Sequence, residues 1–177
     1  MHADHATGTG RLRELTGCRS LVPEGAAAEC ADHFVRDGET LRLGNVTIQA
    51  MAAPGHTDSH MAYLVNGDRV LTGDALLIRG CGRTDFQSGN AAQLYDSVTQ
   101  RLFNLPDETK VYPAHDYHGH SVSSIGEERK WNPRFYGRTR EQFAEYMNDL
   151  KLLYPKKIME ALPANERCGN PSPAAAL

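Results

Sequence analysis

The chain has 177 residues, which suggests one domain long enough to bury a core. Its formal net charge of -3 and its mixture of acidic and basic residues do not indicate nucleic acid or an anionic membrane surface as a partner. No apolar run approaches the roughly 18 residues that cross a bilayer, and the first residues are polar rather than typical of a secretion signal.

The cysteine and histidine positions bear on whether the chain has a disulfide framework or a metal site. The four cysteines lie far apart with no CxxC pair, which favours free thiols in a reducing compartment over a disulfide framework. Most of the eight histidines gather in three short motifs. This clustering favours a metal site over scattered surface histidines.

The N-terminal part of the chain opens with metal-ligand residue types in alternating order, at His2, Asp4 and His5. A glycine-containing loop then leads into a short helix near residues 12–15. We expect a short buried strand over residues 17–22. The small residues of 23–30 are compatible with loop or helix.

Two antiparallel hairpins are predicted next. Residues 40–43 and 46–51 form the first, and 61–65 and 69–71 form the second around an Asn-Gly turn. Each delivers the chain to a glycine turn that ends on a possible metal ligand, His56 or Asp74. A sheet end holds side chains rigidly, as a metal site requires.

The second half of the chain is predicted to be mainly helical. Residues 75–87 are irregular and rich in Gly and Arg, which is typical of a substrate loop. An amphipathic helix follows over 90–102. A short strand at 110–112 leads to His115, and helices are expected at 125–131 and after a capping box at 139–142.

The ligand types leave two chemistries open. Two imidazoles with one carboxylate on one face are the arrangement of non-haem Fe(II) oxygenases. The same residue types serve di-zinc hydrolases, where a metal-bound water is made acidic. The pattern alone does not choose between iron and zinc.

Four short motifs resemble the metal motifs of the metallo-β-lactamase superfamily. They are His2-Ala3-Asp4-His5, Pro54-Gly55-His56-Thr57, Thr72-Gly73-Asp74-Ala75 and Pro113-Ala114-His115. Longer runs are similar to the persulfide dioxygenases, also called sulfur dioxygenases, within that superfamily. They are residues 73–87, 112–119, 127–134 and 163–169. Glyoxalase II hydrolases share the short motifs but not the run from Arg79 to Gln87.

The resemblance implies an α+β fold of the αββα sandwich type and one Fe(II) per chain, with Zn as the alternative. The implied reaction converts glutathione persulfide and O2 into sulfite and glutathione. His56 and Asp74 match iron ligands, and Arg83 and Tyr117 match positions that bind the glutathione moiety. The remaining matched residues are expected to orient the site or to act as alternative ligands. They are His2, Asp4, His5 and His115.

One ligand of the family pattern falls outside this sequence. The family's third iron ligand is the first histidine of a Thr-His-x-His-x-Asp-His motif, and Met1 occupies its first x position. We therefore expect a partial domain over residues 1–169, without the first strands of the N-terminal sheet, and a disordered tail over 170–177. We also expect the 177-residue chain to bind iron weakly.

Two rival functions stay open beside the dioxygenase. One is a glyoxalase II-like zinc thioester hydrolase, and the other is an inactive, metal-free fragment. The sequence indicates a cytoplasmic protein, with mitochondria as the alternative, and it leaves a homodimer open. We expect neither nucleic acid nor membrane as a partner.

Overall fold

The computed structural model describes residues 5–86, 88–153 and 157–169. The chain divides into two compact units, residues 36–151 and residues 1–35 with 152–177. The expected disordered tail, 170–177, lies outside the described residues.

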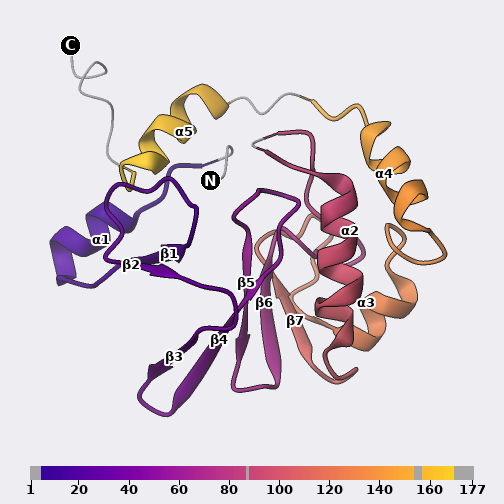
Figure 1. Cartoon of the computed structure of the whole chain (residues 1–177), viewed down its shortest axis with the longest axis horizontal. Coiled ribbons are helices and arrows are strands. Elements are labelled where there is room, and N and C mark those ends of the chain that lie inside the picture. The colour runs from indigo at the N-terminus through magenta and orange to yellow at the C-terminus, as the bar shows by residue number, and fades with distance from the viewer. Residues whose placement is uncertain (1–4, 87, 154–156, 170–177) are drawn as a thin grey trace. The chain divides into compact units, whose positions relative to one another are not determined.

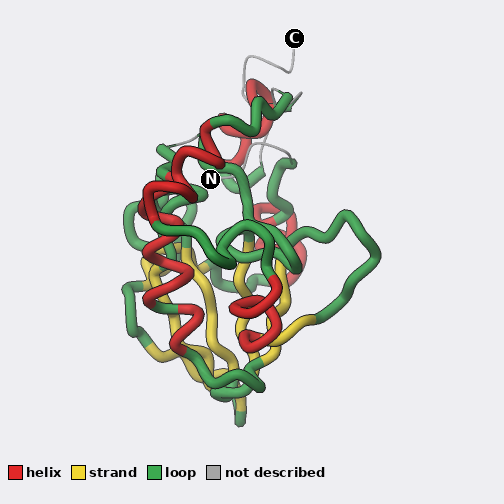
Figure 2. The backbone as a smooth tube through the Cα atoms, turned by 90° about the vertical axis from the view of Figure 1, so that its right-hand side faces the viewer, coloured by secondary structure: helices red, strands yellow, loops and turns green. Residues whose placement is uncertain are grey.

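The larger unit, 36–151, is built on a six-stranded sheet in the order β3-β4-β5-β6-β7-β8, of which Figure 1 labels β3 to β7. The strands stand side by side and are yellow in Figure 2. Their bounds are β3 Thr40–Leu43, β4 Val46–Ala52, β5 Met61–Val65, β6 Arg69–Gly73, β7 Lys110–Pro113 and β8 Ser123–Ser124.

The turn chemistry of the sequence sets the two hairpins. β3 pairs with β4, and β5 pairs with β6, both antiparallel as predicted. Between β5 and β6, Asn66 and Gly67 have φ values of 51° and 74°. Positive φ at both central residues defines the type I′ turn that matches strand twist, and Asn-Gly adopts it readily. The prediction of this hairpin is confirmed.

Strand direction brings separate parts of the chain to one sheet edge. β4 and β6 are each antiparallel to β5, so they run the same way, and β7 is parallel to β6. The C-terminal ends of β4, β6 and β7 therefore lie along the same edge of the sheet, the one that is formed by strand ends and not by an outer strand. The segments that leave this edge begin with the three predicted metal motifs.

Three helices and a short 3-10 turn complete this unit. They are α2 Ala91–Gln100, η1 Leu102–Asn104, α3 Ile125–Trp131 and α4 Arg140–Asn148. Side-chain caps begin all three α-helices, and Thr139 with Gln142 forms the predicted capping box of α4. Leu94, Val98 and Leu102 are fully buried and pack with sheet residues in one apolar core, as their spacing predicted.

The smaller unit has two parallel strands, β1 Leu21–Pro23 and β2 His33–Val35, with helices α1 Thr9–Thr16 and α5 Ile158–Glu166. The prediction of a buried strand over 17–22 is wrong in extent and burial, because β1 begins at Leu21, which is exposed. The apolar pair Leu21-Val22 suggested burial, but none of the three residues of β1 is fully buried, and α1 of the same unit also has no buried residue.

A disulfide joins Cys30 to Cys168 across 138 residues of sequence, with the two Cα atoms 6.2 Å apart. The expectation of four free thiols is therefore wrong for this pair. Sequence spacing could not reveal it, because the fold brings the two ends of the chain together in one unit. Cys18 and Cys81 are free thiols.

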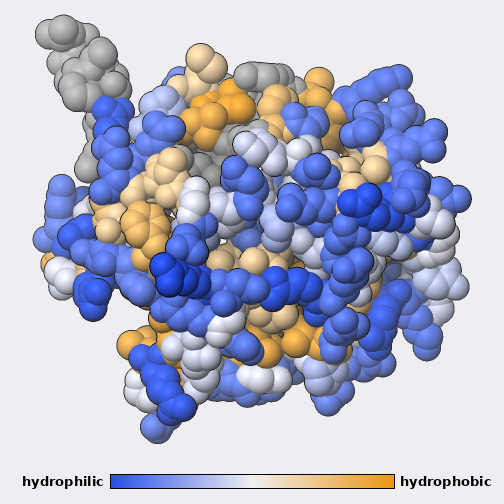
Figure 3. Space-filling view, viewed as in Figure 1, coloured by the Kyte–Doolittle hydropathy of each residue, from blue (hydrophilic) through white to orange (hydrophobic). Residues whose placement is uncertain are grey.

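The surface is mixed in polarity. Figure 3 shows hydrophobic residues separated by hydrophilic ones over the face that it draws. Among the described helices, none combines the length and the apolar character that crossing a bilayer requires.

Candidate metal centre

Three side chains meet at the sheet edge where β4, β6 and β7 end. His56 follows β4, Asp74 follows β6 and His115 follows β7. Their side chains are 11%, 7% and 29% exposed, respectively. The Ala114 N–H donates to the carbonyl of Gly73 at 3.1 Å, which locks the His115 turn to the Asp74 turn. The predicted placement of His56 and Asp74 on sheet-end turns is confirmed.

The ring of His56 has a defined orientation. Its Nδ1 lies 2.7 Å from the carbonyl oxygen of Arg83. A carbonyl oxygen only accepts, so Nδ1 carries a proton, and in the neutral ring Nε2 then has the lone pair. Nε2 lies 3.5 Å from Oδ2 of Asp74. A backbone carbonyl behind the ring is the usual support for a metal-binding histidine.

The His56–Asp74 pair fits two ligands of one metal ion. Ligand atoms about 2.1 Å from a common metal, at angles between a right angle and the tetrahedral angle, are roughly 3.0–3.4 Å apart. The observed 3.5 Å is close to that separation. Within residues 5–86, 88–153 and 157–169, no group of three or more His, Cys, Asp or Glu side chains is arranged to hold a metal ion.

His115 contacts the carboxylate rather than completing a triad. Its Nδ1 lies 2.7 Å from Oδ1 of Asp74 and must donate, because a carboxylate accepts. The contact fixes the rotation of the Asp74 carboxylate while Oδ2 faces His56. The His115 ring also stacks on Tyr117, with centroids 6.0 Å apart and planes 4° apart. Tyr117 is 77% exposed.

Glycines allow the site to be packed closely. At Gly73, which has a φ of 55°, a Cβ would stand 2.6 Å from Cε1 of the buried His60 ring. At Gly82, a Cβ would stand 2.4 Å from the Asp74 carbonyl oxygen and 2.8 Å from His56 Nδ1. Any side chain at Gly82 would therefore displace one of the two candidate ligands.

Arg83 contributes through two different groups. Its carbonyl supports His56, which the sequence did not predict. Its guanidinium binds both carboxylate oxygens of Asp85, at 2.6 and 2.8 Å, and lies 4.3 Å from the Phe86 ring centroid. The hydrogen bond from Arg83 lowers the pKa of Asp85. The nearness of Arg83 and Asp85 in sequence was the available signal for this pair.

Comparison with known proteins identifies the family of this chain. The sequence pattern of the metallo-β-lactamase superfamily matches residues 1–115. The chain is 47% identical over 176 residues to the persulfide dioxygenase ETHE1, mitochondrial, of Homo sapiens, covering 98% of this chain and 68% of the human protein. The chain belongs to the persulfide dioxygenase family of the metallo-β-lactamase superfamily.

A solved structure confirms the family fold. The crystal structure of ETHE1 from Myxococcus xanthus matches with a TM-score of 0.92 and 54% sequence identity, covering 96% of this chain and 74% of that one. A hydroxyacylglutathione hydrolase of Rhodopseudomonas palustris is less similar, at 34% identity over 143 residues, covering 79% of this chain and 55% of that protein. The predicted fold class and family are thereby confirmed.

The N-terminal residues of the family motif are not among the residues that the larger unit contributes. His5 belongs to the smaller unit, where its backbone carbonyl accepts a hydrogen bond from Asn165 at 3.0 Å. His2 and Asp4 lie outside the described residues. The expected roles of these three residues at the metal stay predictions.

Cys81 is the one thiol in the Gly- and Arg-rich loop of the family motif. It packs against the core, with Sγ 3.7 Å from Sδ of Met147. Burial raises the pKa of this thiol to about 12. A thiol that stays protonated near neutral pH is a poor nucleophile, so Cys81 is a packing residue of the loop.

Proposed function

We propose that this chain carries the site of a non-haem Fe(II) persulfide dioxygenase that oxidises glutathione persulfide with O2. One persulfide, one O2 and one water give glutathione, sulfite and two protons. The outer sulfur is oxidised, and both atoms of O2 are reduced. The observation that supports this most is the His56–Asp74 pair at the shared sheet edge, in a chain of this family.

His56 and Asp74 would hold the iron through Nε2 and a carboxylate oxygen. When bound, Fe(II) would supply the electrons and the coordination positions that activate O2 toward the outer sulfur. His115 keeps the Asp74 carboxylate oriented, with a proton held at its own Nδ1. His2, Asp4 and His5 are proposed as further orienting residues or alternative ligands.

Arg83 and Tyr117 are proposed to bind the glutathione moiety. A guanidinium can pair with a carboxylate as a two-bonded fork, and Asp85 already occupies Arg83 in that way. The glutathione carboxylate would therefore share Arg83 with Asp85 or replace Asp85 on it. Tyr117 would donate its hydroxyl from the ring that stacks on His115.

The proposed compartment is the cytoplasm, although the human relative's name places that protein in mitochondria. Antibodies to the native chain on separated cell fractions would decide between the two. We propose iron rather than zinc as the metal because the resemblance to persulfide dioxygenases implies Fe(II).

The test compares two substrates on the same preparation. With Fe(II) in excess under anaerobic loading, we expect oxygen uptake and sulfite formation on addition of glutathione persulfide. We expect no hydrolysis of S-lactoylglutathione with either Fe(II) or Zn(II). Thioester hydrolysis without oxygen uptake would replace this proposal with the glyoxalase II-like function, and neither activity at saturating Fe(II) would contradict both.

A further inference from the structure

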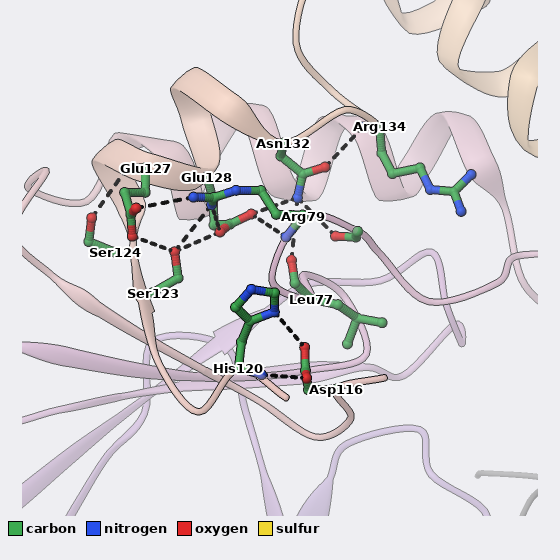
Figure 4. Close-up of polar contacts among 11 residues, drawn as sticks. Leu77, Arg79, Asp116, His120, Ser123, Ser124, Glu127, Glu128, Asn132 and Arg134 are labelled. Atoms are coloured by element: carbon green, nitrogen blue, oxygen red, sulfur yellow. Dashed lines mark hydrogen bonds and ion pairs between the residues drawn. The ribbon is translucent and has the colours of Figure 1, made fainter. Parts of the chain in front are cut away.

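A buried carboxylate lies in the larger unit without touching the candidate metal ligands. Glu128, on α3, is fully buried. Its two oxygens accept hydrogen bonds from the Arg79 side chain, the Arg79 backbone N–H, Ser123 Oγ and Asn132 Nδ2 (Figure 4). A buried charge persists only when it is paired and hydrogen-bonded, so this side chain has one defined position.

Arg79 is held by Glu128 at two points. Its backbone N–H donates to Oε2 at 2.8 Å, and its guanidinium bonds Oε1. The φ of Arg79 is 58°, a left-handed conformation that residues other than glycine rarely adopt. Such a conformation persists where the surroundings fix it, and it is common near functional sites. The double contact with Glu128 supplies that fixation.

Asn132 contacts the same turn through the backbone carbonyl groups of the turn. Leu77 and Gly80 exchange backbone hydrogen bonds of 3.0 and 3.2 Å, which close a tight turn around Arg79. Asn132 Nδ2 donates to the carbonyl oxygens of Gly80 and Leu77, at 3.0 and 3.3 Å. Asn132 also donates to Glu128. Figure 4 shows both side chains directed at this turn.

The turn leads directly into the groups that orient the metal centre. Gly82 N–H donates to the Asp74 carbonyl at 2.8 Å, and the next residue, Arg83, offers its carbonyl to His56. Between Arg79 and Arg83 the chain has only Gly80, Cys81 and Gly82. A shift of the Arg79 turn must therefore be passed on to the Arg83 carbonyl or absorbed in a short, packed segment.

We propose that Glu128 is a positioning residue, which fixes the Arg79 turn and thereby holds the Arg83 carbonyl where it keeps His56 in the Nδ1–H tautomer. This inference rests on the proposed function for its importance, because only that tautomer presents an Nε2 lone pair beside Asp74. Glu128 acts through the turn and touches neither substrate nor metal.

The test replaces Glu128 by glutamine, which keeps the shape of the side chain but turns one acceptor into a donor facing donor groups. The first readout is the 15N NMR spectrum of the His56 ring in the metal-free protein, at about pH 8, where a histidine of ordinary pKa is neutral. The second is the Fe(II) dissociation constant from anaerobic equilibrium dialysis. We expect Glu128→Gln to shift His56 toward the Nε2–H tautomer and to weaken Fe(II) binding about 10-fold, the low end of the effect of residues that support ligands.

The matched control is Val98→Ala, which truncates a fully buried apolar side chain of the core on α2, whereas Glu128 is on α3. It should lower stability but leave the His56 tautomer and the Fe(II) dissociation constant unchanged. Equal changes in both variants would show that Glu128 acts through general destabilisation, and an unchanged tautomer in Glu128→Gln would overturn the proposal directly.

A second variant keeps the test decisive if Glu128→Gln does not fold. Ser123→Ala removes one donor, at 2.6 Å from Glu128 Oε1, and should shift the tautomer in the same direction by a smaller amount. No shift in a folded Ser123→Ala would then overturn the proposal. The tautomer readout needs neither iron nor persulfide. A tautomer shift in a chain without dioxygenase activity would reject only the proposed function, whereas dioxygenase activity with an unchanged tautomer would reject only this inference.

Discussion

Different interactions stabilise the interior of each of the two compact units of the chain. The larger unit packs strand residues and helix residues into one apolar core, with fully buried side chains such as Leu94 and Phe143. Among its described residues, the smaller unit has few buried apolar side chains, and these include Val35 and Ile158. Polar and covalent ties replace burial there, chiefly the bonds of Asn165 and the Cys30–Cys168 disulfide.

This difference decides where a candidate metal centre can be rigid. His56, Asp74 and His115 emerge from three strands of the well-packed unit, so their geometry is fixed by burial of the sheet. His5 lies in a segment of the smaller unit that Asn165 joins through hydrogen bonds to Thr7 and to His5. The larger unit can therefore hold the two candidate ligands in position before a metal binds. Substitutions in the smaller unit should change its stability through single hydrogen bonds or the disulfide.

The largest effect is expected from the core of the larger unit. Phe143→Ala removes a fully buried ring that stacks on Phe135, with centroids 4.8 Å apart. It should lower the free energy of unfolding by about 3–5 kcal/mol, measured by urea titration. Leu12→Ala on α1, where the side chain is 56% exposed, is the control and should change that free energy by less than about 0.5 kcal/mol. Similar losses in the two variants would erase the contrast between the units.

The next effect concerns the disulfide of the smaller unit. Replacing Cys30 by serine should cost about 2–4 kcal/mol, because a bridge across 138 residues restricts the unfolded chain strongly. Hydrogen exchange should speed up in residues 5–35 and stay unchanged in the β4–β6 strands. Cys18→Ser, at an exposed free thiol, serves as the control. Uniformly faster exchange in both units would contradict the separate accounts.

A smaller effect is expected at Asn165. Its Oδ1 accepts from the Thr7 N–H at 2.7 Å, and its Nδ2 donates to the His5 carbonyl at 3.0 Å. Asn165→Ala should cost about 1–3 kcal/mol, since it leaves partly buried backbone groups unpaired. Asn165→Asp keeps the acceptor for Thr7 and should cost less. Exchange of the Thr7 amide reports the difference, and equal rates in the two variants would contradict the assigned bonds.

The smallest effect is a pH dependence in the larger unit. Burial raises the pKa of the folded Cys81 thiol to about 12, from an ordinary value of 9.0. Above pH 9 the unfolded chain releases this proton more readily than the folded chain, so stability falls as pH rises. The loss should be about 1.4 kcal/mol at pH 10. Cys81→Ala should lack this component, and identical stability profiles between pH 8 and pH 10.5 would count against a buried thiol.

Local sequence patterns predicted most of the larger unit. The alternating strands, the Asn66-Gly67 turn and the capping box at Thr139 depend on interactions between near neighbours, so they can be read from one sequence. His56 and Asp74 could be assigned for the same reason, because each ends a glycine turn after a strand. The structure confirms their placement after β4 and β6, and their role as metal ligands stays a prediction.

Long-range contacts could not be predicted in this way. Glu128 occurs in a charged segment that is typical of a solvent-exposed helix, yet it is fully buried because Arg79, 49 residues away, pairs with it. Cys30 and Cys168 are likewise far apart in sequence, and only the folded chain brings them close enough to form a disulfide. Helix α5 was missed because Pro163 lies inside it, and proline is a poor helix former.

The most direct test of the central claim, that His56 and Asp74 are two ligands of one ion, is anaerobic equilibrium dialysis of the 177-residue chain against Fe(II). We predict saturation at one Fe(II) per chain with weak affinity, a loss of more than about 100-fold in His56→Ala and Asp74→Ala, and a smaller loss in His115→Ala. The control His33→Ala, on β2 of the smaller unit, should bind as the parent does. Unchanged Fe(II) binding in folded His56→Ala and Asp74→Ala proteins would contradict the account.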